Sequence, residues 1–100
     1  MNTELQEAVA AVDDAHRRWL ESATGQLVTE LDRLIGELTH KRHEYALDRS
    51  RALLAQLRGE RFTGPPIGDI DKLISGLDRR IRHLERERDV ALFADLEAWL

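Results

Sequence analysis

Residues 64–68 read Gly-Pro-Pro-Ile-Gly and separate two long runs of helix-forming sequence. The first run extends from Leu27 to Leu57 and the second from Ile70 to Leu100, and neither contains a proline. In both runs the apolar residues recur at three- and four-residue steps, which places them on one face of a helix. Because glycine and proline end helices and form turns, this layout predicts two long helices that fold back on each other as an antiparallel hairpin.

A shorter helix is expected ahead of the hairpin. Thr3 and Gln6 have the spacing of a capping box, and apolar residues from Leu5 to Leu20 fall on one helical face. Gly25 is expected to cap or hinge the end of this helix. The sequence therefore predicts one all-helical domain over residues 1–100, a coiled-coil-like three-helix bundle. Its helices are expected at about 3–22, 25–58 and 69–99, with a loop at 59–68.

Composition limits the classes of protein to which the chain can belong. Of its 100 residues 42% are hydrophobic and 34% are charged, which suits a helical domain with one modest core. The net charge of -4 does not favour a nucleic-acid binder, which usually carries a strong basic excess. There is no cysteine, and Met1–Glu4 lacks the features of a secretory signal. We expect a cytoplasmic protein without a membrane span.

The short first helix leaves part of the hairpin uncovered. Folded back, it would cover residues 25–44 and 82–100 and leave the tip, residues 45–58 and 69–82, bare. Exposed apolar patches of this kind usually mark an interface. The sequence therefore predicts a homodimer that associates through the tip, with Leu53, Leu57, Ile70, Leu73 and Ile74 at the contact. The alternative is a compact monomer in which the second helix bends at Gly36.

Two polar clusters interrupt the apolar faces. Folding the hairpin about the centre of its loop sets residues 39–44 opposite residues 83–88, so that both helices turn polar at one height. The simplest interpretation is a solvated face with ion pairs between neighbouring side chains. A surface for an anion or a protein partner is the second interpretation, and it would use Lys41, Arg42, Arg86 and Arg88.

A metal site is a further interpretation of the same clusters. His40 with Glu44, and His83 with Glu87, have the i,i+4 spacing at which side chains on one helix face meet. Dimetal helical bundles use a Glu-x-x-His motif on each of two helices, whereas this chain has that spacing only once, at Glu37 and His40. No metal and no cofactor is predicted.

Three stretches resemble the small all-helical chorismate mutases. They are residues 31–35, residues 41–47 and residues 66–72, about 40 residues with the segments around them. The resemblance implies an intertwined helical dimer with an Arg/Lys-lined pocket for a dicarboxylate. It would make Arg42 a substrate-binding arginine and Lys72 a second cation near the loop.

The chain departs from that family at three positions. Leu53 stands where the family has a lysine, Leu73 where it has an acid and Gly25 where it has an arginine. These departures remove groups on which electrostatic stabilisation in such a pocket depends.

The chain also lacks a phosphate-binding glycine loop, a nucleophile elbow and an H-E-x-x-H motif. The sequence is rich in helix-pairing information and poor in catalytic motifs. It therefore favours a small protein–protein interaction module, an adaptor, regulator or inhibitor, over an enzyme. There are two alternatives. One is the chorismate-mutase-like enzyme, and the other is a nucleic-acid accessory factor that binds through the lysine and arginine side chains of residues 69–99.

Overall fold

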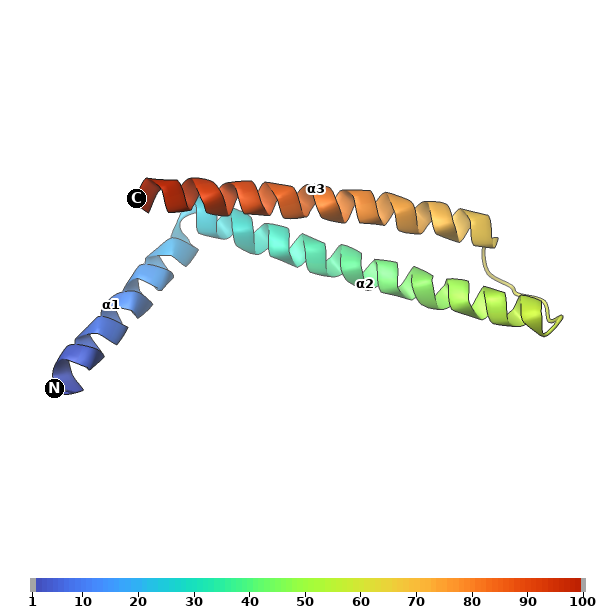
Figure 1. The fold of residues 1–100 in the computed structure, drawn as a ribbon, viewed down its shortest axis with the longest axis horizontal. Helices are drawn as coiled ribbons and strands as arrows, with labels where there is room; N and C mark the ends of the chain where they lie inside the picture. Colours follow the sequence, from blue (N-terminus) through green and yellow to red (C-terminus); the bar gives the residue numbers. More distant parts are fainter. Residues whose placement is uncertain (1, 100) are drawn as a thin grey trace.

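The computed structural model describes residues 2–99, and the side chains of residues 2–96, as three helices. They are α1 (Asn2–Glu21), α2 (Ala23–Leu57) and α3 (Ile67–Trp99). The two long helices pack against each other as an antiparallel hairpin, whereas α1 leaves the hairpin at an angle (Figure 1). The all-helical class and the pairing of the two long helices are confirmed. None of the described helices is long and apolar enough to span a bilayer.

A single residue, Ser22, joins α1 to α2. Its Oγ donates to the carbonyl of Trp19 at 2.5 Å and accepts from the backbone N–H of Gly25 at 3.1 Å, so it caps the start of α2. Gly25 is buried in the first turn of α2 and is not the cap of α1 that the sequence suggested. A Cβ at Gly25 would lie 1.9 Å from the Trp19 carbonyl oxygen. Only glycine allows the two helices to meet so closely.

The other end of α2 closes with a Schellman motif. Gly59 has φ +67°, Gly59 N–H donates to Gln56 O, and Glu60 N–H donates to Ala55 O. The chain then turns back, and Phe62 and Ile67 line a hollow together with Ala52. The Pro65-Pro66 segment leads into α3, whose first hydrogen bonds run to Pro66 O.

The core of the hairpin is thin. Its buried apolar side chains are Val28, Leu31 and Ala52 from α2 and Ile70 and Ile81 from α3, and of these only Ile70 has no exposed surface. α2 continues without a break through Gly36, so the bent-helix alternative is wrong. At Gly36 no other atom lies within 4 Å of the place of a Cβ, and the close helix contact that this glycine suggested is absent.

Three ion pairs between the long helices define their register. Asp32 pairs with Arg88, Arg42 with Asp78 and Arg49 with Asp71. In each pair the two residue numbers have the same sum, as expected for two antiparallel helices in a single register. Arg42 therefore lies opposite Asp78, about two helical turns from the predicted 83–88 cluster.

The two polar clusters consequently do not face each other. The prediction placed the fold-back at the middle of the loop. In the structure α2 extends beyond the start of α3, and the loop runs back along the end of α2 before α3 begins.

The prediction that the first helix folds back over the hairpin is wrong. α1 contacts α2 only near their junction and does not pack along α3 (Figure 1). Antiparallel helices need a connection of about two to five residues, and Ser22 alone is too short to reverse the chain. As a result no residue of α1 is buried.

The molecule is therefore extended, with dimensions of 71 × 29 × 18 Å and a radius of gyration of 21.6 Å. A compact domain of this length has a radius of gyration of about 13 Å. The solvent-accessible surface is 8046 Å², whereas a compact monomer of the same mass exposes about 5,800 Å². The excess of about 2,200 Å² is larger than the share that one protein buries in a standard interface, about 800 Å².

Candidate interaction surfaces

The residues predicted for self-association do not form one surface. Ile70 is completely buried inside the hairpin and Ile74 is half-buried, so Ile70 is not part of the exposed surface of the hairpin. Leu53, Leu57 and Leu73 are exposed, and Leu57 is 85% exposed. Ile70 and Leu57 both look apolar in sequence, but the register turns the first inward and leaves the second on the overhang of α2.

Two of the four cations predicted to face a partner are engaged within the hairpin. Arg42 donates from Nη2 to Asp78 Oδ2 at 3.4 Å, and its Nε also pairs with this carboxylate. Arg88 donates to Asp32 at 3.1 Å and lies 3.5 Å from Asp89. The hydrogen bond from each arginine to its aspartate, Asp78 or Asp32, raises the arginine pKa. These charges tie α2 to α3.

The other two predicted cations, Lys41 and Arg86, are exposed and line different hollows. Lys41 belongs to a groove of about 590 Å³ between α2 and α3, which we call the basic groove. Its charged rim consists of Lys41 from α2 and Lys72, Arg79 and Arg80 from α3, with His83 at one end. Its floor consists of Tyr45, Leu73, Gly76 and Leu77.

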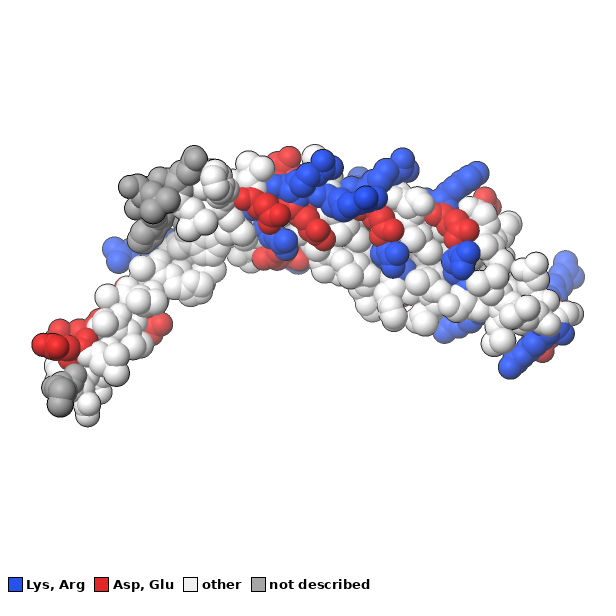
Figure 2. All heavy atoms as spheres, viewed as in Figure 1, with Lys and Arg blue, Asp and Glu red and all other residues white. Residues whose placement is uncertain are grey.

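No carboxylate lines the basic groove, and none of its four cations forms an ion pair with a described residue. On the face seen in Figure 2, lysine and arginine side chains along α3 alternate with acidic ones, whereas the lining of the basic groove contains cations alone among its fully charged side chains. The groove therefore combines an apolar floor with uncompensated positive charge. Such a surface fits an elongated ligand that is both acidic and apolar.

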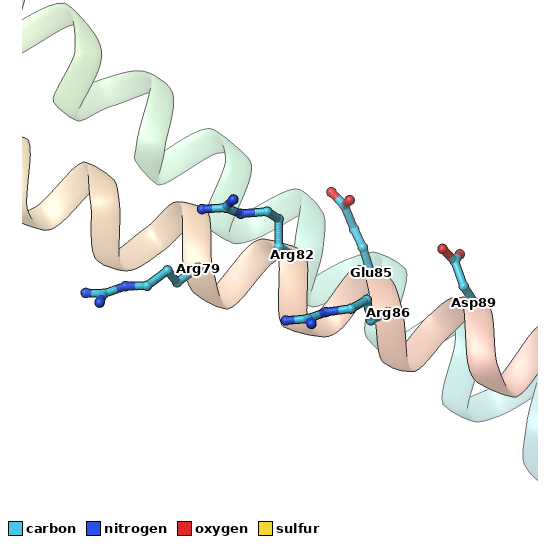
Figure 3. Close-up of a pocket in the computed structure, with 5 residues that line it drawn as sticks. All are labelled: Arg79, Arg82, Glu85, Arg86 and Asp89. Carbon is cyan, nitrogen blue, oxygen red and sulfur yellow. The ribbon is translucent and has the colours of Figure 1, made fainter.

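The hollow that contains Arg86 is a weaker candidate. It is lined by Arg79, Arg82, Glu85, Arg86 and Asp89, all from α3 (Figure 3). Because one helix supplies every side chain, the hollow has no second wall to hold a ligand, and Glu85 and Asp89 offset its positive charge.

An apolar stripe on α1 is the second surface without a cover. Leu5, Val9 and Val12 lie at three- and four-residue steps and are 68%, 54% and 67% exposed. We call these three residues the α1 stripe. α1 also carries five carboxylates against two arginines, and Figure 2 shows acidic side chains near its free end. It is thus an acidic amphipathic helix.

Trp19 holds the base of α1 and leaves this stripe free. Its half-buried ring lines hollows with Asp95 and Leu96 of α3, and it stacks on His16 with 6.3 Å between ring centroids.

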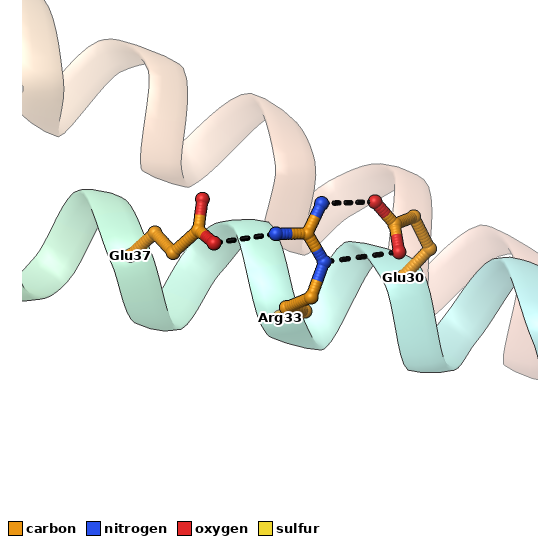
Figure 4. A network of polar contacts seen from close by, with 3 residues as sticks. All are labelled: Glu30, Arg33 and Glu37. Carbon is orange, nitrogen blue, oxygen red and sulfur yellow. Dashed lines mark hydrogen bonds and ion pairs between the residues drawn. The ribbon is translucent and has the colours of Figure 1, made fainter.

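One network of ion pairs on the N-terminal half of α2 supports the helix itself. Arg33 bridges Glu30 and Glu37, one helical turn away on either side (Figure 4). The hydrogen bond from Arg33 lowers the pKa of Glu30, and the two carboxylates raise the pKa of Arg33. All three side chains are more than half exposed, so this network is local helix support.

The histidines do not assemble a metal site in the described part of the chain, where no group of three potential ligands lies close together. His40 Nε2 lies 3.2 Å from Glu44 Oε1, and both side chains are exposed. Lys72, the second residue suggested by the chorismate-mutase resemblance, lines the basic groove, whereas Arg42 is paired with Asp78. The two cations therefore do not present free charge to one ligand.

Sequence reasoning missed most of the basic groove, because it grouped charges by their density along the chain. Lys72 and Arg79 are one heptad apart, which puts them on the same helical face. That spacing is the signal that could have found the rim of the groove.

Neither family models, curated proteins nor solved structures match the chain. Its function is therefore inferred from these surfaces.

Proposed function

We propose that the chain is a small helical protein–protein interaction module that acts by binding other helices through surfaces that its own fold leaves uncovered. The observation that carries this proposal is α1, a 20-residue amphipathic helix without a buried residue. Most helical stability in proteins comes from packing of the apolar face and not from the helix propensity of the residues. A partner that covers the α1 stripe supplies that packing.

The surface area of the whole chain supports the same proposal. The excess of about 2,200 Å² over a compact monomer is enough for a stable interface even if only part of it is buried. The thin core, with Ile70 alone fully buried, leaves little internal stabilisation to spare.

We further propose that one partner is a second copy of the chain, so that the protein is a homodimer, and that it works in the cytoplasm. A chain without cysteine has no disulfide to stabilise a thin core outside the cell. Association is the remaining way to cover the exposed apolar surface.

The test compares two variants of the full chain. In the first, Leu5→Gln, Val9→Gln and Val12→Gln are combined, which removes the α1 stripe from an exposed helix. In the matched control, Ala10→Gln and Asp14→Gln alter another face of the same helix, where both residues are exposed.

Sedimentation velocity over a range of micromolar concentrations measures the mass of each protein. We expect wild type and control to associate and the stripe variant to remain monomeric, with the hairpin still helical by circular dichroism. A wild-type chain that stays monomeric at every concentration would refute the homodimer. Equal association of all three proteins would remove the α1 stripe from the function.

A further inference from the structure

We propose that the basic groove of one copy receives α1 of a second copy. This inference rests on the proposed function, because it names the surface and the partner through which the module self-associates. Three independent properties of the two surfaces match, namely their charge, their apolar residues and their length.

The basic groove and α1 carry opposite charges. Lys41, Lys72, Arg79 and Arg80 rim the groove without a carboxylate among the residues that line it. On α1, Glu4 and Asp13 lie on opposite sides of the α1 stripe when about 100° of rotation is assigned to each residue. A helix that lays its stripe into the groove therefore directs one carboxylate toward each rim. Complementary charge of this kind fixes the orientation of a partner and speeds association.

The apolar parts also correspond. Leu5, Val9 and Val12 are all more than half exposed, and Leu73, 43% exposed, lies in the floor of the groove. An amphipathic helix in an apolar groove uses anchors at these three- and four-residue steps. At Gly76 a Cβ would meet no other atom within 4 Å, so nothing in the hairpin fills this part of the floor.

The lengths agree as well. The groove extends from Lys72 to His83 on α3, about 16 Å along the helix. The α1 stripe, from Leu5 to Val12, is about 10 Å long and therefore fits within the groove.

The occupant has to come from another copy. α1 begins its departure at Ser22, whereas the α2 side of the groove lies at Lys41 and Tyr45, about 28 Å further along α2. The one-residue link does not reverse the chain, and α1 points away from the groove (Figure 1). A second molecule can present its α1 to the groove without any change in either hairpin.

The decisive experiment is a charge exchange between two full-length chains. The groove variant carries Lys41→Glu, Lys72→Glu and Arg80→Glu, which leaves Arg79 as the one cation against three carboxylates at the rim, and the arm variant carries Glu4→Lys and Asp13→Lys. Each variant alone opposes like charges, because its groove and its α1 then have the same sign. Mixed, the two variants offer an acidic groove to an α1 made basic and a basic groove to an acidic α1. A third chain that combines all five substitutions is complementary to itself.

We expect each variant alone to dimerise roughly tenfold or more weakly than wild type, as read by sedimentation velocity at low salt. The mixture and the combined chain should both recover dimerisation. High salt should weaken the wild-type dimer, because it screens exposed charges. Arg58→Glu with Arg61→Glu is the matched control, since these exposed arginines lie outside the groove, and it should leave the dimer unchanged.

A steric variant tests the floor of the groove independently. Gly76→Gln replaces a helical glycine by a better helix former, so the hairpin should not lose stability. The longer side chain nevertheless occupies the groove and should abolish dimerisation at concentrations at which the wild type is dimeric.

The outcomes separate the two proposals. A dimer that survives both charge variants and Gly76→Gln, but dissociates on Leu57→Glu, would place the contact at the hairpin tip and overturn this inference while leaving the interaction module intact. A strictly monomeric wild-type chain would overturn both the inference and the proposed homodimer. Failure of the mixture to recover the dimer would also refute the arm-in-groove contact.

Discussion

Replacement of Ile70 by alanine tests whether the hairpin holds together through its observed register. Ile70 is the only fully buried large side chain among the described residues, and it directly precedes Asp71 of the Arg49–Asp71 ion pair. The substitution removes three carbon atoms, which corresponds to about 2.4 kcal/mol at about 0.8 kcal/mol per buried methylene. In protein cores such a change costs about 2–5 kcal/mol once the cavity is included.

The expected loss in the free energy of unfolding lies near the lower end of that range, at about 2–3 kcal/mol. Only two helices surround the site and they are free to approach each other, so a cavity can partly collapse. Urea unfolding followed by far-ultraviolet circular dichroism measures the loss, and it should be repeated at two protein concentrations because association contributes to stability.

The matched control is Leu57→Ala, at an apolar side chain that is 85% exposed. It should change the free energy of unfolding by less than about 0.5 kcal/mol. A loss below about 1 kcal/mol for Ile70→Ala, or an equal loss for Leu57→Ala, would show that the two helices do not pair in this register.

Other substitutions probe the ends and the acid response of α2. Gly59→Ala should lower the free energy of unfolding by about 1 kcal/mol, because a φ of +67° is strained for alanine. Gly36→Ala should raise it by about 0.5–1 kcal/mol, because a Cβ at this position meets no atom. Urea denaturation measures both variants, and a change of the same sign in the two would refute this contrast. Gly25→Ala should lower the thermal unfolding temperature, since the new Cβ would collide with the Trp19 carbonyl, and an unchanged melting curve would disprove the close junction. Arg33 lowers the pKa of Glu30, so their contact stabilises α2 above about pH 4.5 and is lost as the pH falls through the lowered pKa of the folded state. Glu30→Gln should therefore reduce the loss of helicity in acid. A pH titration of the circular dichroism signal that is the same in the variant and the wild type would contradict this role of the Glu30–Arg33 contact.

The ion pairs across the hairpin have a different role from the uncompensated charges of the groove. Arg42 and Arg49 are one heptad apart on α2, and so are Asp78 and Asp71 on α3. Each pair is only partly shielded from water, so its contribution to stability is small. Their main consequence is register, because a shift of the helices by one turn would break both contacts.

These pairs also explain why the predicted site divides. Sequence density placed Arg42 and Arg88 with Lys41 and Arg86 in one cationic surface. In the folded chain Arg42 is paired with Asp78 and Arg88 with Asp32. Lys41 instead lines the basic groove with Lys72, Arg79 and Arg80 of α3, none of which belonged to the predicted surface.

The three helices and the pairing of the two long ones could be predicted from local patterns of residues. Proline-free runs with apolar residues every three or four positions have few ways to bury those residues other than as paired helices, and Gly59 with Pro65 and Pro66 leaves one place for the turn. These are local signals, which depend on neighbours within a few residues.

The direction of α1, the register of the hairpin and the composition of the groove depend instead on contacts between residues far apart in the sequence or at the junction of two helices. The direction of α1 follows from a one-residue link and from the contact of Gly25 with Trp19. The register follows from pairing of Arg42 and Arg49 with aspartates more than 20 residues away, which periodicity cannot select because a slip of one heptad preserves the same apolar face. Lys41 of α2 and Lys72 of α3 line the same groove because of that register, so the groove cannot be predicted from the pattern of either helix alone.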